Sequence, residues 1–140
     1  MSPDLTVVVV DDHPLLRSGV VETLNAADGV QVVGEGGSAD DAVATVRAKE
    51  PDVLVLDLGI PGGGLTAARR IVEAGLDTRI AVLTASEDEQ QLEDALKLGV
   101  RAYLLKGVSA SELVDVVRRV ARDEVYVTPA LAARRLIDKS

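Results

Sequence analysis

Short apolar runs recur along the chain and are separated by longer segments of mixed character. The strongest runs occupy residues 5–10, 53–56, 80–83 and 102–105, and a weaker run occupies residues 30–33. Such runs lack the regular alternation of apolar and polar residues that a half-exposed strand shows, and they are typical of strands buried on both faces of a sheet. We therefore predict five buried strands.

The segments between these runs have the spacing of amphipathic helices. Leu16, Val20 and Leu24 recur at four-residue intervals, and the later segments show related patterns. Alternating strands and helices form a parallel sheet with right-handed crossovers and helices on both faces. Five strands suit the order 2-1-3-4-5. The sequence predicts an α/β fold with a doubly wound five-stranded parallel sheet of flavodoxin-like topology.

Two helix starts carry a local signal. Ser86 is followed by Glu89, and Ser109 is followed by Glu112. At this spacing the serine oxygen accepts a hydrogen bond from a backbone N–H of the first turn, and the glutamate reaches back to the N–H of the serine. We predict that a helix begins after each serine.

The region after Asp123 departs from the alternating pattern. Thr128 and Pro129 are typical of a helix cap and a first helical residue, and residues 130–137 form an amphipathic stretch. This stretch is predicted to be either a sixth helix or a linker. We expect one compact domain over residues 1–122 and a linker or additional C-terminal helix over residues 123–140.

Three carboxylates follow strands that the predicted order makes neighbours. Asp11 and Asp12 end the first strand, and Asp57 ends the third. Ligands bind at this carboxyl edge of a doubly wound sheet, and carboxylates packed together repel one another unless a cation or a proton neutralises them. Mg²⁺ suits the site, because it binds few carboxylates, keeps several waters and binds phosphate oxygens. Since Asp is common in turns after strands, one such residue alone would carry little weight.

Asp57 is the candidate nucleophile, because a carboxylate can attack phosphorus to form an acyl phosphate beside a metal ion that screens the incoming charge. Thr84 ends the fourth strand and can offer a hydroxyl to a phosphoryl oxygen. Lys106 ends the fifth strand and can offer an ammonium group. A strand-end Thr or Lys is usually just solvated, but together these residues supply the parts of a phosphoryl-transfer site.

Composition excludes several classes of function. The net charge is −8 and the basic residues are scattered, so this segment would repel a nucleic acid backbone. There are two Tyr, no Phe or Trp and no Cys, which argues against base stacking and thiolate catalysis. No apolar run approaches the roughly 18 residues of a membrane span, and the first residues lack the pattern of a secretion signal. We expect a cytoplasmic protein with no membrane contact.

His13 is the only histidine of the chain and directly follows the paired aspartates. We interpret it as structural, because a site that selects hard oxygen ligands has little use for imidazole. With no second histidine, the chain cannot carry its own phosphohistidine. The phosphoryl group would have to come from a partner kinase or from a small acyl phosphate.

Four motifs in register resemble the receiver domain of two-component response regulators. They are Val-Val-Val-Asp-Asp-His-Pro-Leu-Leu-Arg-Ser-Gly from residue 8, Asp-Leu-Gly-Ile-Pro-Gly from residue 57, Leu-Thr-Ala-Ser from residue 83 and Arg-Ala-Tyr-Leu-Leu-Lys from residue 101. The Asp-Asp-His-Pro and Tyr-Leu-Leu-Lys stretches resemble the NarL/FixJ (LuxR-type) subgroup. The resemblance covers roughly residues 5–122, which is far more specific than one motif.

The resemblance implies a role for each residue of the site. Asp57 is then the phosphorylated residue, and Lys106 contacts the phosphoryl group. Mg²⁺ is then bound by the carboxylates of Asp11, Asp12 and Asp57 and by the backbone carbonyl of Gly59.

The resemblance also implies a signal relay formed by Thr84 and Tyr103. We expect the Tyr103 ring to swing from solvent into the space that Thr84 vacates when it moves toward the phosphoryl group. Lys106 is followed by Gly107 where many receivers have Pro, so the cis peptide often found there cannot be assumed.

The implied partners are a sensor histidine kinase and a second copy, with homodimerisation on activation. Control of transcription would run through a C-terminal helix-turn-helix domain that binds DNA and is absent from this chain. The chain would then be either truncated or a stand-alone receiver, and the likeness of residues 124–137 to the subgroup's linker favours truncation. The alternative function is a stand-alone or phosphorylation-independent receiver that acts through protein–protein contacts.

Two other classes with related chemistry or topology fit poorly. Phosphatases of the haloacid dehalogenase type place an aspartate nucleophile on the first strand, two residues before a second Asp. Here Asp11 and Asp12 are adjacent, and the isolated Asp57 follows the third strand. A flavin carrier needs a phosphate loop after the first strand, and the Asp-Asp-His-Pro stretch would repel that phosphate.

Overall fold

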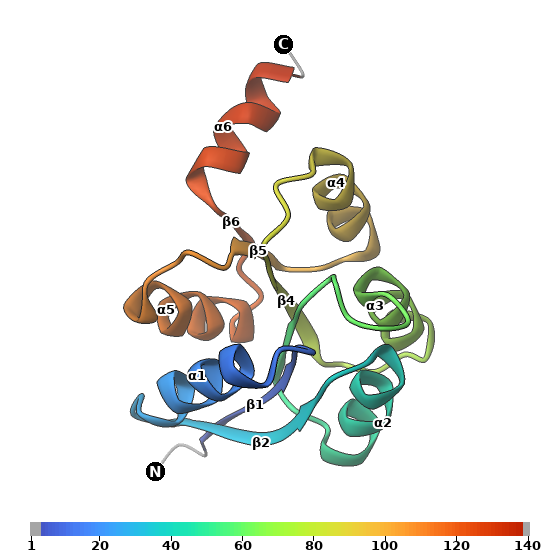
Figure 1. Ribbon diagram of the computed structural model, residues 1–140, viewed down its shortest axis with the longest axis vertical. Coiled ribbons are helices and arrows are strands. Elements are labelled where there is room, and N and C mark those ends of the chain that lie inside the picture. Colours follow the sequence, from blue (N-terminus) through green and yellow to red (C-terminus); the bar gives the residue numbers. More distant parts are fainter. Residues whose placement is uncertain (1–3, 139–140) are drawn as a thin grey trace.

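A six-stranded parallel sheet with the order β2-β1-β3-β4-β5-β6 runs through the molecule (Figure 1). The computed structural model describes residues 4–138. The strands are β1 Leu5–Val10, β2 Val30–Gly36, β3 Val53–Leu56, β4 Arg79–Thr84, β5 Ala102–Leu105 and β6 Tyr126–Val127. The predicted fold class and the predicted order of the first five strands are confirmed, and the sheet extends beyond the prediction by one short edge strand.

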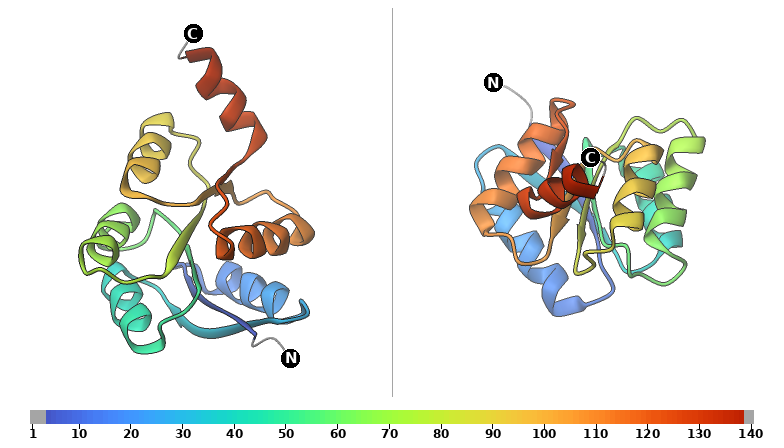
Figure 2. Two further views of the ribbon diagram at one scale, coloured as in Figure 1. Left: turned by 180° about the vertical axis from the view of Figure 1, so that it is seen from behind. Right: turned by 90° about the horizontal axis from the view of Figure 1, so that it is seen from above.

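Helices cover both faces of this sheet. The helices of the described residues are α1 Pro14–Asn25, α2 Ala39–Lys49, α3 Gly64–Glu73, α4 Glu89–Leu98, α5 Ala110–Ala121 and α6 Pro129–Asp138. Helices α1 and α5 pack on one face, while α2, α3 and α4 pack on the other (Figure 2). None of the helices over residues 4–138 is long and apolar enough to cross a membrane.

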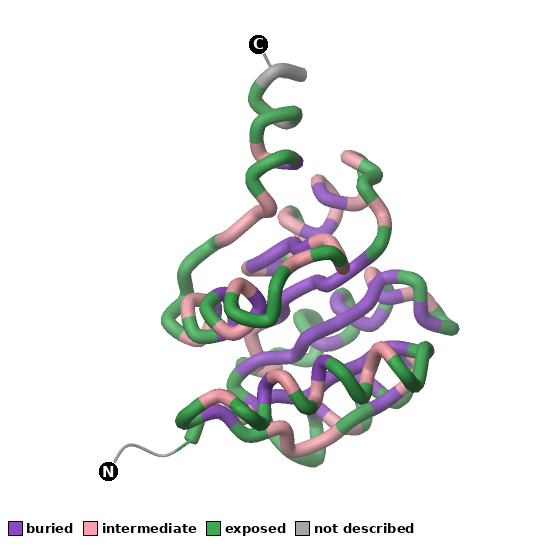
Figure 3. The backbone as a smooth tube through the Cα atoms, turned by 60° about the vertical axis from the view of Figure 1, so that its left-hand side comes forward, coloured by how far each residue is buried: buried purple, intermediate pink, exposed green. Residues whose placement is uncertain are grey.

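The core consists of two hydrophobic clusters, one on each face of the sheet. Val7 and Val9 of β1 point into the cluster below α1 and α5, while Val8 and Val10 point into the cluster below α2, α3 and α4. Because alternate side chains of a strand enter opposite faces, a strand covered on both faces needs apolar residues throughout. Figure 3 shows the resulting buried strands inside a shell of more exposed helices.

One of the two predicted helix starts is confirmed and the other is wrong. Ser109 Oγ accepts a hydrogen bond from the N–H of Glu112 at 3.1 Å and caps α5. The N-cap of α4 is Asp88, whose carboxylate accepts from the N–H of Gln90 at 2.8 Å. The Ser86 hydroxyl instead accepts from the Asp88 N–H at 3.2 Å, and the Ser86 backbone is bonded to the Thr84 and Tyr103 side chains.

The C-terminal region forms both β6 and α6. Pro129 is the first residue of α6, as predicted, and Leu131 of this helix is fully buried in the same cluster as α4. The strand β6 was not predicted, because two residues are too few to show a periodic pattern. Its register pairs Ala102 with Tyr126 and Tyr103 with Val127.

Candidate functional site

Asp11 and Asp57 lie side by side at the carboxyl edge of the sheet. They directly follow β1 and β3, which pair through Val10 and Leu56. The ladder continues past the strand ends, since the Asp57 N–H donates to the Val10 carbonyl at 3.0 Å. Both aspartates are only 4% exposed. Two carboxylates so close in a buried position require a cation or a proton between them.

Asp12 and His13 complete a compact group with these two aspartates. One ligand atom from each of the four residues lies within 4.8 Å of the others. His13 Nδ1 is 3.1 Å from a carboxylate oxygen of Asp11 and equally far from one of Asp12. The backbone N–H of His13 also donates to Asp11 Oδ1 at 2.8 Å and so orients that carboxylate. The ring itself is largely exposed, so it borders the cluster on the solvent side.

Lys106 supplies a positive charge to the buried aspartates. Its Nζ lies 3.0 Å from Asp11 Oδ2 and 3.2 Å from Asp57 Oδ2, with 16% of the side chain exposed. Burial acts to raise the pKa of Asp11, but hydrogen bonds from His13 and Lys106 outweigh it and lower the pKa. Burial likewise acts to lower the pKa of Lys106, and its two carboxylate partners raise it. Asp11 and Lys106 are therefore held in their charged forms.

The oxygen ligands of this cluster fit a hard divalent cation. Asp11, Asp12 and Asp57 present carboxylates at one point, and oxygen ligands are what Mg²⁺ binds. The Gly59 N–H donates to Asp57 Oδ1 at 3.3 Å, so the backbone of Gly59 borders the same carboxylate. A Cβ at position 59 would lie 3.7 Å from Asp57 Oδ2. The three predicted carboxylate ligands are thus grouped around one small volume, and the Gly59 N–H lies beside one of them.

Thr84 and Tyr103 lie on the neighbouring strands β4 and β5, and both side chains bond to the backbone of Ser86. Thr84 Oγ1 accepts from the Ser86 N–H at 3.3 Å, and the Tyr103 hydroxyl donates to the Ser86 carbonyl at 3.3 Å. Burial raises the pKa of Tyr103 to about 12. The ring is fully buried, so the expected starting position in solvent is not the one that the structure shows.

The structure identifies two supporting residues that the sequence analysis did not select. Arg17 donates to the backbone carbonyls of Asp11 and Gly36, at 3.1 and 3.0 Å, and so ties together the ends of β1 and β2. A Cβ on Gly64 would lie 2.4 Å from Leu58 Cα and 2.6 Å from the Asp57 carbonyl oxygen. The run of three glycines at residues 62–64 was the available signal for this close approach.

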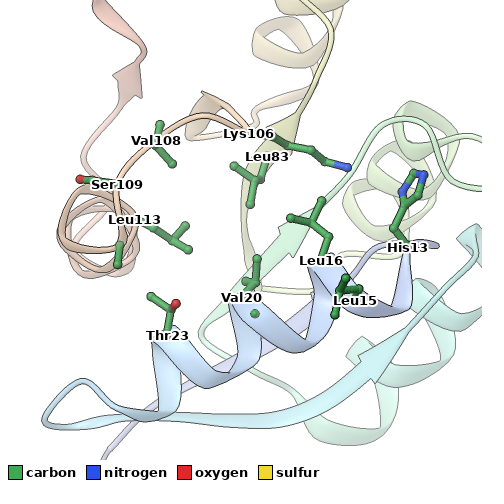
Figure 4. Close-up of a pocket in the computed structure, with 12 residues that line it drawn as sticks. His13, Leu15, Leu16, Val20, Thr23, Leu83, Lys106, Val108, Ser109 and Leu113 are labelled. Atoms are coloured by element: carbon green, nitrogen blue, oxygen red, sulfur yellow. The ribbon is translucent and has the colours of Figure 1, made fainter.

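A groove of about 700 Å³ runs from the carboxylate cluster along α1 and α5. Its lining is mostly apolar, with Leu16 and Val20 of α1 facing Leu113 of α5. His13 and Lys106 stand at the end nearest the aspartates (Figure 4). The groove is therefore continuous with the site.

Every peptide bond of the described residues is trans, including the Lys106–Gly107 bond.

Comparison with known proteins matches this geometry to one family. The family model of the response regulator receiver domain matches residues 7–118. The nitrate/nitrite response regulator protein NarL of Escherichia coli (strain K12) is 35% identical over 133 residues, which cover 91% of this chain and 62% of NarL. The chain spans about three fifths of the length of the curated relatives it matches.

Solved structures of related proteins have the same fold. The signal receiver domain of the response regulator NarL from Mycobacterium tuberculosis is 35% identical, with a TM-score of 0.84 over 86% of this chain and 98% of that chain. A LuxR-family two-component response regulator from Aurantimonas sp. SI85-9A1 is 28% identical, with a TM-score of 0.92 over 97% of this chain and 98% of that chain. The chain belongs to the receiver domains of two-component response regulators and is of the NarL/FixJ type.

Proposed function

We propose that this receiver accepts a phosphoryl group on Asp57 with Mg²⁺ bound beside it. The observation that carries the proposal is the convergence of two buried carboxylates on one ammonium group. Lys106 Nζ lies 3.2 Å from Asp57 and 3.0 Å from Asp11. Asp11, Asp12, Asp57 and the Gly59 carbonyl are the proposed ligands. The bound cation would neutralise charge on the transferring phosphoryl group.

In the proposed reaction an Asp57 carboxylate oxygen attacks phosphorus and forms an acyl phosphate. The bond between phosphorus and the donor atom, a histidine nitrogen or an acyl oxygen, breaks, and the donor keeps the electron pair. Lys106 is the proposed partner of one phosphoryl oxygen, and the Thr84 hydroxyl is the proposed donor to another. The chain is not an enzyme that turns over a separate substrate. Its proposed catalysis is limited to its own phosphorylation and dephosphorylation.

The groove between α1 and α5 is the proposed docking surface for the phosphodonor, a sensor histidine kinase. His13 and Lys106 line both the groove and the acceptor site, so a protein seated there would reach Asp57 directly. Leu15 at the edge of the groove is 88% exposed. An exposed apolar residue beside a reactive site suits a protein partner better than solvent.

The proposed output is a change of contacts that phosphorylation promotes, through Thr84 and Tyr103, in a cytoplasmic regulator of transcription. Homodimerisation and DNA binding by a helix-turn-helix domain outside this chain are parts of this proposal. Residues 1–122 would be the receiver, and residues 123–140 would lead to the output domain. The likeness to NarL supports this arrangement.

Incubation with acetyl phosphate and Mg²⁺, followed by mass spectrometry of the intact chain, tests the acceptor. The parent should gain one phosphoryl mass, and Asp57→Asn should gain none because the amide is not a nucleophile for phosphorus. The matched control is Asp52→Asn, since Asp52 lies before β3 at the opposite edge of the sheet. Equal labelling of Asp57→Asn and the parent would refute the assignment.

A further inference from the structure

The C-terminal segment (residues 126–138) is bound to the edge of β5 that faces away from β4. The Tyr126 N–H donates to the Arg101 carbonyl at 2.9 Å, and the Thr128 N–H donates to the Tyr103 carbonyl at 3.1 Å. Thr128 Oγ1 accepts from the Leu105 N–H at 3.3 Å. The segment therefore supports the strand that carries Tyr103 and ends at Lys106.

Helix α6 of this segment is held by two side chains one helical turn apart, Leu131 in the core and Arg134 on the β4–α4 loop (residues 85–88). Leu131 is fully buried in the cluster that also contains Tyr103 and Leu92. The Arg134 guanidinium donates to the Glu87 carbonyl at 3.0 Å and lies 3.6 Å from the Glu89 carboxylate. In Figure 1, α6 stands beside the start of α4, beyond the end of β5.

The same loop is bonded to the two relay residues from its other side. The Ser86 N–H donates to Thr84 Oγ1, and the Ser86 carbonyl accepts from the Tyr103 hydroxyl. Ser86 and Glu87 are consecutive, so a displacement of the Ser86 peptide also moves the Glu87 carbonyl that Arg134 binds. One short loop thus connects the acceptor side of the sheet to α6.

We propose that the face formed by the β4–α4 loop and β5 is a docking surface for the C-terminal segment, and that a phosphoryl group on Asp57 weakens this docking. The inference rests on the proposed phosphorylation of Asp57. It assigns to residues 126–138 an intramolecular binding role rather than that of a passive linker. Leu131 and Arg134 are the anchors, and Thr128 is the fixed point at which the segment remains attached to β5.

The direction of the coupling follows from the bonds at Ser86. Thr84 Oγ1 is directed at the loop, where it accepts from the Ser86 N–H. A phosphoryl group on Asp57 offers the Thr84 hydroxyl a charged acceptor, and hydrogen bonds to charged groups are about twice as strong as neutral ones. When Thr84 turns toward that acceptor, the loop loses a bond that holds it in position. The Glu87 carbonyl then shifts relative to Arg134, and α6 loses one of its anchors.

Reciprocity provides a second readout, because two coupled equilibria affect each other by the same factor. If phosphorylation weakens the docking of α6, then a variant in which α6 binds its docking surface more weakly must bind a phosphoryl mimic more tightly. Arg134→Ala is the suitable variant, since Arg134 is partly exposed and its removal leaves the core intact. Arg118→Ala is the matched control, because Arg118 also donates to a loop carbonyl, that of Asp28, away from the site.

The experiment compares the 140-residue chain with and without beryllofluoride and Mg²⁺. Hydrogen exchange of the α6 amides should become about fivefold faster with beryllofluoride, a factor at the lower end of ordinary allosteric couplings. Arg134→Ala should show fast exchange in both conditions and should bind beryllofluoride more tightly by a similar factor. Arg118→Ala should match the parent in both measurements.

Three outcomes would overturn the inference. If beryllofluoride raises the melting temperature while α6 exchange stays unchanged or slows, the coupling is absent or has the opposite sign, and the proposed function stands. If Arg134→Ala binds beryllofluoride as the parent does, Arg134 does not link the two sites. If beryllofluoride fails to bind the parent at all, the proposed function is refuted and this inference with it.

Discussion

The Lys106 ammonium lies 3.0 Å from the Asp11 carboxylate and at almost the same distance from Asp57. It comes from β5, two strands away from β3 in the sheet. The position of this single cation therefore depends on the register of β4 and β5, in which Thr84 pairs with Leu105 and the Lys106 N–H donates to the Thr84 carbonyl at 2.9 Å.

Replacement of Lys106 by Met should destabilise the domain most when divalent cations are absent. The variant leaves two buried carboxylates without their shared partner, which should lower the free energy of unfolding by about 1–3 kcal/mol. Addition of Mg²⁺ should restore part of it, because the cation screens the same repulsion. Urea unfolding in chelator and in Mg²⁺ measures both effects.

Lys97→Met is the control for this measurement. Lys97 lies exposed in the last turn of α4, away from the carboxylate cluster. Its replacement should change stability by less than about 0.5 kcal/mol in either condition. Equal loss in the two lysine variants, or no response of Lys106→Met to Mg²⁺, would contradict the role assigned to Lys106.

Removal of divalent metal should stop phosphorylation by acetyl phosphate. Without a bound cation the incoming phosphoryl group meets the negative charges of Asp11, Asp12 and Asp57. Intact mass measured in excess chelator, and again after Mg²⁺ is restored, checks this. Labelling that persists in chelator would remove Asp11 and Asp12 as metal ligands.

Replacement of Gly64 by Ala should destabilise the domain by about 1–3 kcal/mol, the usual cost of overpacking. The added methyl group would overlap the backbone of Leu58 and the carbonyl of Asp57, neither of which can move without displacing the acceptor. Gly19→Ala is the control, since no atom lies within 4 Å of the added Cβ in α1. The free energy of unfolding of that variant should rise by up to about 1 kcal/mol, because Ala loses less backbone entropy than Gly in a helix. Thermal melts that rank the two variants in the reverse order would contradict the close approach at Gly64.

The sequence predicted the parts of the molecule that depend on repeated patterns. The buried strands were predictable from runs such as residues 53–56, and the proximity of Asp11 and Asp57 was predictable because neighbouring parallel strands end at one edge of the sheet. Contacts made by single residues were not predictable. Asp88 and Ser86 are both residue types that cap helices, and the structure uses Asp88 as the cap while the Ser86 backbone is bonded to Thr84 and Tyr103. The attachment of β6 and Leu131 likewise depends on tertiary packing that leaves no periodic signal.

Titration of Tyr103 should occur near pH 12. Burial disfavours the phenolate, and it raises the pKa from its ordinary value of 10.0 to about 12. A raised pKa stabilises the fold fully below pH 10, and this contribution is lost as the pH rises through about 12. Ultraviolet absorbance of Tyr126→Phe, which keeps Tyr103 as the single tyrosine, measures the midpoint. A midpoint at the ordinary value would show that the ring is not buried in solution.

Replacement of Tyr103 by Phe should separate phosphorylation from its transmission. The change keeps the buried ring and removes only the hydroxyl that donates to the Ser86 carbonyl, at a cost of about 0.5–1.5 kcal/mol. No hydrogen bond among the described residues joins the Tyr103 hydroxyl to Asp57 or Lys106, so labelling by acetyl phosphate should stay within about twofold of the parent, a change of less than 0.5 kcal/mol in the barrier.

The α4 region should respond differently in the same variant. In the parent, beryllofluoride should shift the amide resonances of the β4–α4 loop and α4, because Thr84 and Tyr103 are both bonded to the backbone of Ser86 in that loop. Without the hydroxyl, the loop keeps its bond to Thr84 and loses its bond to β5, so these shifts should shrink and any self-association that beryllofluoride promotes should weaken. Tyr126→Phe, which loses only a hydroxyl bonded to Glu112, should behave as the parent. If Tyr103→Phe and the parent gave the same shift changes across α4 and the same self-association, the relay through Tyr103 would be wrong.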